Sequence, residues 1–109
     1  MNNTIKQVSI SDLKELLKDN KSQVIDVREK AEYERVRIPG TKLVPLSEFE
    51  KKYSVIDRNR PVYIHCGVGS RAQKAAEYLS SVGYENLYVI DGGIKAWIEA
   101  GYPVEQGQP

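Results

Sequence analysis

A short β-rich run, a glycine-containing loop and an amphipathic helix follow one another between residues 62 and 79. The run Val62–His65 is rich in residue types that favour strands. After the loop, apolar residues recur at the i, i+3, i+4 and i+7 positions of one helix face: Ala72, Ala75, Ala76 and Leu79. Strands that alternate with helices are typical of a parallel sheet, so this stretch predicts an α/β fold.

Similar signals occur along the rest of the 109 residues, a length that suits one domain. Further strands are predicted near residues 8–10, 24–27, 43–45 and 87–90, and further helices near 12–17, 29–35, 48–53 and 94–100. Ser11 and Ser47 are the expected N-caps of two of these helices, and Gly83 is an expected C-terminal cap. We therefore predict a single α/β domain over 1–109, with a mainly parallel sheet and helices on both faces. Residues 1–6 and 106–109 are expected to be loose tails.

The charge pattern argues against nucleic acid or a membrane surface as partner. The net charge is only +1, and acidic and basic residues are mixed along the chain without a basic block. No apolar run approaches the length of a membrane span, and the first residues do not resemble a secretory signal. We therefore expect a cytoplasmic protein with no membrane and no nucleic-acid partner.

The chain has one cysteine, Cys66, and one histidine, His65. A single cysteine excludes an internal disulfide and a multi-cysteine metal site. With only one further histidine beside it, a structural zinc site is not expected either. No metal and no cofactor are predicted.

The loop that begins at Cys66 has the features of an anion site. Cys66 lies at the carboxyl end of a predicted strand and just before a helix, whose N-terminus offers unpaired N–H groups and partial positive charge. Gly67 and Gly69 allow successive amides to point inward, and Arg71 adds a permanent cation. These features favour a thiolate, so Cys66 is the predicted nucleophile and the substrate-binding residues are Gly67, Val68, Gly69, Ser70 and Arg71. His65 points to the opposite face of the strand and is interpreted as a packed or surface residue.

Five segments, taken in order, resemble the single-domain rhodanese family over nearly the whole chain. They are the Asp-x-Arg of 26–28, Tyr33 with the Arg-Ile-Pro-Gly of 37–40, the six-residue loop 66–71, Gly83 with Tyr84, and the closing segment 91–97. The resemblance implies a five-stranded parallel sheet with flanking helices. It also implies a sulfurtransferase in which Cys66 takes sulfane sulfur from a small anionic donor, such as thiosulfate or a persulfide, and becomes a persulfide.

The resemblance also assigns supporting roles. The loop amides of 67–71 would hold the sulfur, and Asp26 and Arg28 would brace the wall of the active site. Gly92, Gly93 and Trp97 would pack behind the loop. With no second cysteine, the acceptor must be external: a small thiol, cyanide or a partner protein.

The chain departs from the family pattern at three positions. Arg37 stands where the family commonly has histidine, and Thr41 where a small alanine is common. Gly67 stands where many thiosulfate-using members have lysine or arginine. The loop therefore lacks a cation that those members place beside the cysteine.

Three other functions are compatible with parts of the sequence. A cysteine phosphatase would share His65-Cys66 and a following arginine, but that family has five residues between cysteine and arginine, and this chain has four. A dinucleotide-binding motif would use Gly67, Gly69, Ala72 and Asp91, yet only 18 residues follow Asp91, too few for the remaining strands. A non-catalytic or sulfur-relay module that binds a partner protein is the third.

Overall fold

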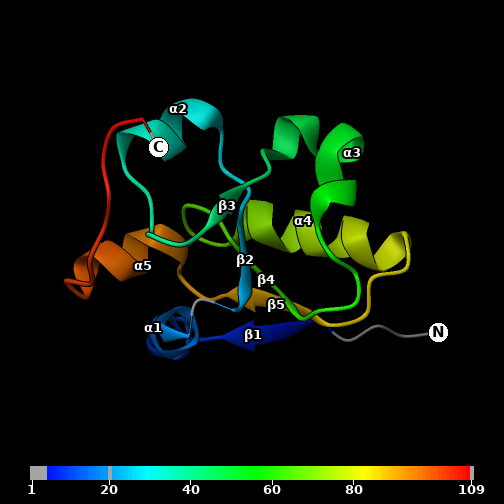
Figure 1. Ribbon diagram of the computed structural model, residues 1–109, viewed down its shortest axis with the longest axis horizontal. Coiled ribbons are helices and arrows are strands. Elements are labelled where there is room, and N and C mark those ends of the chain that lie inside the picture. The colour runs from blue at the N-terminus through cyan, green and yellow to red at the C-terminus, as the bar shows by residue number, and fades with distance from the viewer. Residues whose placement is uncertain (1–4, 20, 109) are drawn as a thin grey trace.

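One five-stranded sheet forms the centre of the protein (Figure 1). The structure is a computed structural model that describes residues 5–19 and 21–108. All neighbouring strands run parallel, in the order β1-β5-β4-β2-β3. The strands are β1 (Lys6–Val8), β2 (Gln23–Asp26), β3 (Lys42–Leu43), β4 (Val62–His65) and β5 (Leu87–Ile90).

Helices connect the strands, as parallel pairing requires. They are α1 (Ile10–Lys18), α2 (Lys30–Arg35), α3 (Phe49–Lys52), α4 (Ser70–Ser81) and α5 (Gly93–Glu99), with short 3₁₀ turns at Leu46–Glu48 and Tyr53–Val55. The predicted α/β fold with five parallel strands is confirmed.

Two apolar cores lie on the two faces of the sheet, between the strands and the helices on either side of them (Figure 1). Alternate residues of each strand point to opposite faces, so Ile64 belongs to one core and Tyr63 packs against the other. One core packs the sheet against α4 and α3 and includes Leu79 and Phe49. The other packs it against α1 and α5 and includes Leu13 and Trp97. Helices therefore cover both faces, as predicted, and the carboxyl ends of β2 and β4 meet at one edge.

Two predicted helix starts were wrong. The first helix is capped by Ser9, whose hydroxyl accepts the N–H of Asp12 at 3.1 Å, so it begins before Ser11. The expected strand 8–10 correspondingly ends at Val8. Ser47 caps no helix; its hydroxyl lies 2.6 Å from the carboxylate of Glu29, where it donates a hydrogen bond. In the first case a neighbouring serine caps instead, and in the second the hydroxyl is bound by a carboxylate from a distant segment.

The expected loose tails are shorter than predicted. Lys6 pairs with Tyr88 in the sheet, and the N–H of Gly107 donates to the carbonyl of Glu34 at 2.7 Å. Residues 1–4 and 109 lie outside the described residues, so the expectation for them stays a prediction.

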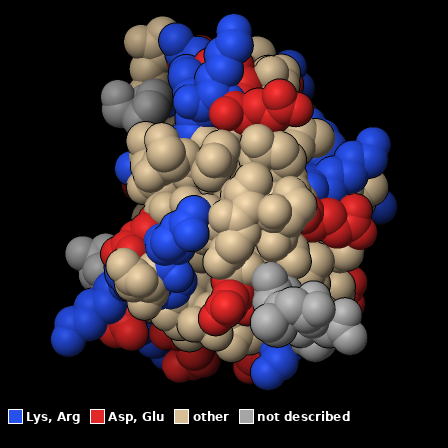
Figure 2. Space-filling model, turned by 90° about the vertical axis from the view of Figure 1, so that its right-hand side faces the viewer, with Lys and Arg blue, Asp and Glu red and all other residues tan. Residues whose placement is uncertain are grey.

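The outer surface shown in Figure 2 carries charges of both signs. Acidic and basic side chains lie interspersed around a central uncharged area, and no patch of one sign dominates this face. Within the part of the chain that the structure describes, no helix is both long enough and apolar enough to cross a membrane.

Candidate active site

Cys66 directly follows β4, at the edge where the strands end and α4 begins. The side chain is buried, with 1% of its surface exposed. Its sulfur accepts two backbone N–H groups, that of Gly69 at 3.0 Å and that of Ala72 at 3.3 Å. Two donors aimed at one sulfur stabilise negative charge on it, which is what a thiolate nucleophile requires.

The start of α4 explains why these amides are available. The first residues of a helix have no carbonyl four residues earlier to bond to, and the amide of Ala72 is one of these unpaired donors. Gly69 precedes the helix with a φ of +132°, a conformation that L residues rarely adopt, and its own N–H is the donor that lies 3.0 Å from the sulfur. The sequence analysis missed Ala72 as a donor; its position in the first turn of the predicted helix was the available signal.

In the described structure, the backbone N–H groups of the other predicted loop residues make no hydrogen bond to the sulfur. Val68 is 61% exposed at the tip of the loop, and Ser70 begins α4. The carbonyl of Gly67 accepts the N–H of Lys95 at 3.1 Å. The predicted role of these residues in holding transferred sulfur stays a prediction.

The N-terminus of α5 holds the loop from behind. The carbonyl of Cys66 accepts the N–H of Ile94 at 2.9 Å. Gly93 lies so close that an added Cβ would stand 2.4 Å from the carbonyl oxygen of Cys66 and 2.6 Å from that of Gly67. Gly92 precedes it with a φ of +80° and lies against Ala96. Trp97 instead packs in the core between α1 and α5, where its indole N–H donates to Pro103.

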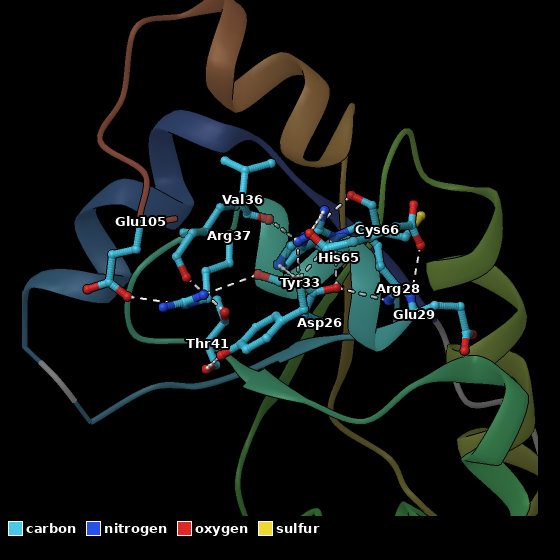
Figure 3. A network of polar contacts seen from close by, with 12 residues as sticks. Asp26, Arg28, Glu29, Tyr33, Val36, Arg37, Thr41, His65, Cys66 and Glu105 are labelled. Atoms are coloured by element: carbon cyan, nitrogen blue, oxygen red, sulfur yellow. Dashed lines mark hydrogen bonds and ion pairs between the residues drawn. The ribbon is translucent and has the colours of Figure 1, made fainter. Parts of the chain in front are cut away.

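Asp26, the last residue of β2, and Arg28 form a buried ion pair (Figure 3). The guanidinium Nη2 lies 2.8 Å from Oδ2 of Asp26 and also donates to the carbonyl of Val36 at 2.7 Å. The pair thus ties the end of β2 to the end of α2. This arrangement suits the expected bracing role, which stays a prediction.

His65 is fully buried on the face of β4 opposite Cys66 (Figure 3). It pairs with Asp26 across the strands, and its Nε2 lies 3.5 Å from Oδ2 of that residue. Burial lowers the pKa of His65 below its ordinary value, although the Asp26 carboxylate and the carbonyl of Cys66 work in the opposite direction. The imidazole is therefore a neutral, packed side chain, and no contact joins it to the sulfur in the described structure.

This burial predicts a pH-dependent stability. Below the ordinary pKa of 6.5, unfolded His65 takes up a proton that the folded protein does not, so the free energy of unfolding falls as the pH falls. Between pH 6.5 and 5.5 the loss is expected to be about 1 kcal/mol in urea unfolding. His65→Asn cannot take up this proton and should be nearly independent of pH over that range. If the free energy of unfolding of this variant falls by the same amount, a titratable group other than His65 causes the pH dependence.

Glu32 and Arg71 form an ion pair at the mouth of the loop. Arg71 Nη1 lies 2.6 Å from Oε1 of Glu32, and Nη2 lies 3.1 Å from Oε2. Chiefly through this hydrogen bond, the pKa of Glu32 is lowered to about 2 and that of Arg71 is raised. The sequence analysis missed Glu32, because 39 residues separate it from Arg71 and nothing local links them.

Arg37, which replaces the histidine common in the family, holds the carboxyl-terminal segment (Figure 3). Only 5% of its surface is exposed. It donates to the carbonyl of Tyr33 at 3.2 Å and forms an ion pair with Glu105 at 3.3 Å. The phenol of Tyr33 in turn donates to the carbonyl of Thr41 at 2.8 Å. These contacts join the end of α2 to the carboxyl-terminal segment and to the segment before β3.

The sequence profile described as rhodanese-like domain matches residues 9–100. The chain belongs to the rhodanese-like family. A rhodanese-related protein from Thermoplasma volcanium has a similar crystal structure, with a TM-score of 0.82 and 35% sequence identity, covering 92% of this chain and 97% of that one.

Two curated relatives resemble this rhodanese-like chain in sequence. A thiosulfate sulfurtransferase GlpE from Pseudoalteromonas translucida is 33% identical over 97 residues, which are 89% of this chain and 91% of that protein. A putative sulfur carrier protein YrkF from Bacillus subtilis is 32% identical over 95 residues, which are 86% of this chain. The match spans only about half of the Bacillus protein, 51% of its length.

Proposed function

We propose that this protein is a sulfurtransferase in which Cys66 carries the transferred sulfur as a persulfide. The observation that carries the proposal is the pair of backbone donors, from Gly69 and Ala72, aimed at the sulfur of the chain's only cysteine. The descriptions of the two relatives, one a thiosulfate sulfurtransferase and one a putative sulfur carrier, support the same chemistry.

The reaction has two halves. In the first, the Cys66 thiolate attacks the outer sulfur of the donor, the bond behind that sulfur breaks, and the donor's remainder leaves with the electron pair. Cys66 then carries one additional sulfur as a persulfide. In the second half, an acceptor attacks this terminal sulfur and the Cys66 thiolate is the leaving group. The amides of Gly69 and Ala72 stabilise the thiolate that begins and ends the cycle.

The acceptor is an external nucleophile. Cys66 is the sole thiol of the chain, so no internal thiol can resolve the persulfide. A small thiol, cyanide or the thiol of a partner protein could accept the sulfur. The last of these would make the protein a sulfur relay, a role that the description of the Bacillus relative favours.

A phosphatase would use the same loop differently. Only four residues separate Cys66 from Arg71, which is one fewer than the phosphatase loop and shortens the ring by up to ~3.5 Å. Arg71 is also bound to Glu32, whereas a phosphoryl group would require this guanidinium for its own oxygens. Both features support a single sulfur atom as the anion at the centre.

Intact mass spectrometry tests the proposal. After incubation with thiosulfate or a persulfide donor, the protein should gain the mass of one sulfur atom, and cyanide or a thiol should remove it. Protein whose Cys66 is first alkylated should gain nothing. Failure to gain sulfur from any donor, or rapid hydrolysis of an aryl phosphate, would contradict the proposed function.

A further inference from the structure

The two arginines of the site differ from free cations because each is paired with one carboxylate. Arg28 is bound to Asp26 in the interior, and Arg71 is bound to Glu32 at the mouth of the loop. The charge that each arginine brings is therefore balanced by its own partner. In the described part of the site, the groups that donate hydrogen bonds to the sulfur are backbone N–H groups, not the arginine side chains.

Arg71 lies where a loop cation would act. Its Nη2 stands 3.2 Å from the position that a Cβ of residue 67 would occupy. Residue 67 is glycine here, so Arg71 is the basic side chain next to this part of the loop. The Cys66 sulfur is near enough to contribute to the raised pKa of Arg71.

Glu32 is held in place independently of Arg71. Its Oε1 accepts the backbone N–H of Glu29 at 2.9 Å, as part of the capping box that begins α2. The side chains of Arg71 and Glu32 are 34% and 36% exposed, so the pair is open to entering anions. A donor that approaches Cys66 thus meets a fixed carboxylate as well as the guanidinium.

We infer that Glu32 is a specificity-determining residue that disfavours dianionic donors such as thiosulfate and favours sulfane donors of lower charge, such as persulfides. The inference rests on the proposed function. A paired Arg71 gives little net attraction to a second negative charge on the donor, because the carboxylate repels what the guanidinium attracts. The native donor class is then a persulfide rather than thiosulfate.

Glu32→Gln tests this inference with two donors that transfer the same outer sulfur. Glutamine can still accept the N–H of Glu29, so the capping box is preserved while the charge is lost. Thiosulfate is a dianion that leaves as sulfite, and benzenethiosulfonate is a monoanion that leaves as a sulfinate. Because electrostatic energy scales with donor charge, we expect the rate constant of persulfide formation to rise about tenfold with thiosulfate and about threefold with the thiosulfonate.

Two further variants control this result. Glu34→Gln removes the same charge from the same helix, but Glu34 pairs with Lys30 and not with Arg71, so both rate constants should stay at the wild-type values. In the double variant Glu32→Gln with Arg71→Gln, the rate constant of persulfide formation from thiosulfate should not rise, because the guanidinium that attracts the donor is also absent. If both donors change by the same factor, or if thiosulfate becomes slower, Glu32 only supports the loop and the inference is wrong.

Alkylation separates this inference from the proposed function. Iodoacetate is an anion and iodoacetamide is neutral, and both transfer a similar group to Cys66 with the same leaving group. Glu32→Gln should raise the rate constant for iodoacetate, relative to that for iodoacetamide, about threefold. This increase is expected whether or not the protein transfers sulfur. An unchanged ratio would overturn the inference alone. A raised ratio without any persulfide would leave the electrostatic role of Glu32 standing and overturn the sulfurtransferase together with its donor preference.

Discussion

Cys66→Ser is expected to abolish sulfur transfer, with a loss of at least about a thousandfold in rate. An alcohol is a far weaker nucleophile than a thiolate, and the two donors from Gly69 and Ala72 do not make serine ionise at neutral pH. No other thiol is present to replace it. The loss should be visible both as the absence of a sulfur mass gain and as the absence of product from the acceptor.

The same variant should remain folded, which makes the result interpretable. Serine is close in size to cysteine, and its oxygen can accept the N–H groups of Gly69 and Ala72 that the sulfur accepts. Urea unfolding is expected to show a change of no more than about 2 kcal/mol. Substantial turnover by folded Cys66→Ser would show that the sulfur is not carried on this residue.

Gly93→Ala is expected to be strongly destabilising and to disrupt the site at the same time. The new Cβ would stand 2.4 Å from the carbonyl oxygen of Cys66 and 2.8 Å from the carbonyl carbon of Gly67. These are backbone atoms, so the loop itself must move. With a φ of +57° added to this overpacking, we expect the free energy of unfolding to fall by about 2–4 kcal/mol. Sulfur transfer should fall as well, because the displaced loop carries Cys66.

Gly101→Ala is a matched control for backbone strain. Gly101 follows the same helix, has a φ of +77°, and an added Cβ would meet nothing within 4 Å. Gly101→Ala therefore measures the cost of the backbone conformation without a steric clash. We expect the free energy of unfolding to fall by about 1 kcal/mol and sulfur transfer to be unchanged. If Gly93→Ala costs no more than Gly101→Ala, the close approach of α5 to the loop does not contribute to stability.

Local patterns were sufficient to predict the fold class and the position of Cys66 between a strand and a helix. The strand Val62–His65 was predicted with its observed bounds, because β-rich residues are followed directly by a glycine turn. The predicted helix after the loop is α4, and its apolar face is buried in one of the two cores. A cysteine between these elements necessarily lies at the carboxyl edge of the sheet and at a helix N-terminus. Its anion-stabilising surroundings therefore follow from a few neighbouring residues.

Helix caps were less predictable from the same patterns. Ser9 and Ser11 are both residue types that favour an N-cap, but Ser9 caps the first helix and Ser11 lies within its first turn. The chain begins the helix at Ile10 because that residue then packs against the core with Leu13 and Trp97. Ser47 was predicted to cap a helix, but the carboxylate of Glu29, 18 residues away, binds its hydroxyl instead.

The sequence by itself determined the order of strands and helices, the position of Cys66 between a strand and a helix, and the chain's single thiol. These features depend on residues within about one helical turn of each other. Only the tertiary structure decided that Glu32 neutralises Arg71, that Asp26 lies beside His65, and that α5 presses Gly93 against the loop. Each of these contacts joins segments that are distant in the chain. Their distances are set by strand order and register, which bring the carboxyl ends of β2, β4 and β5 to one edge of the sheet.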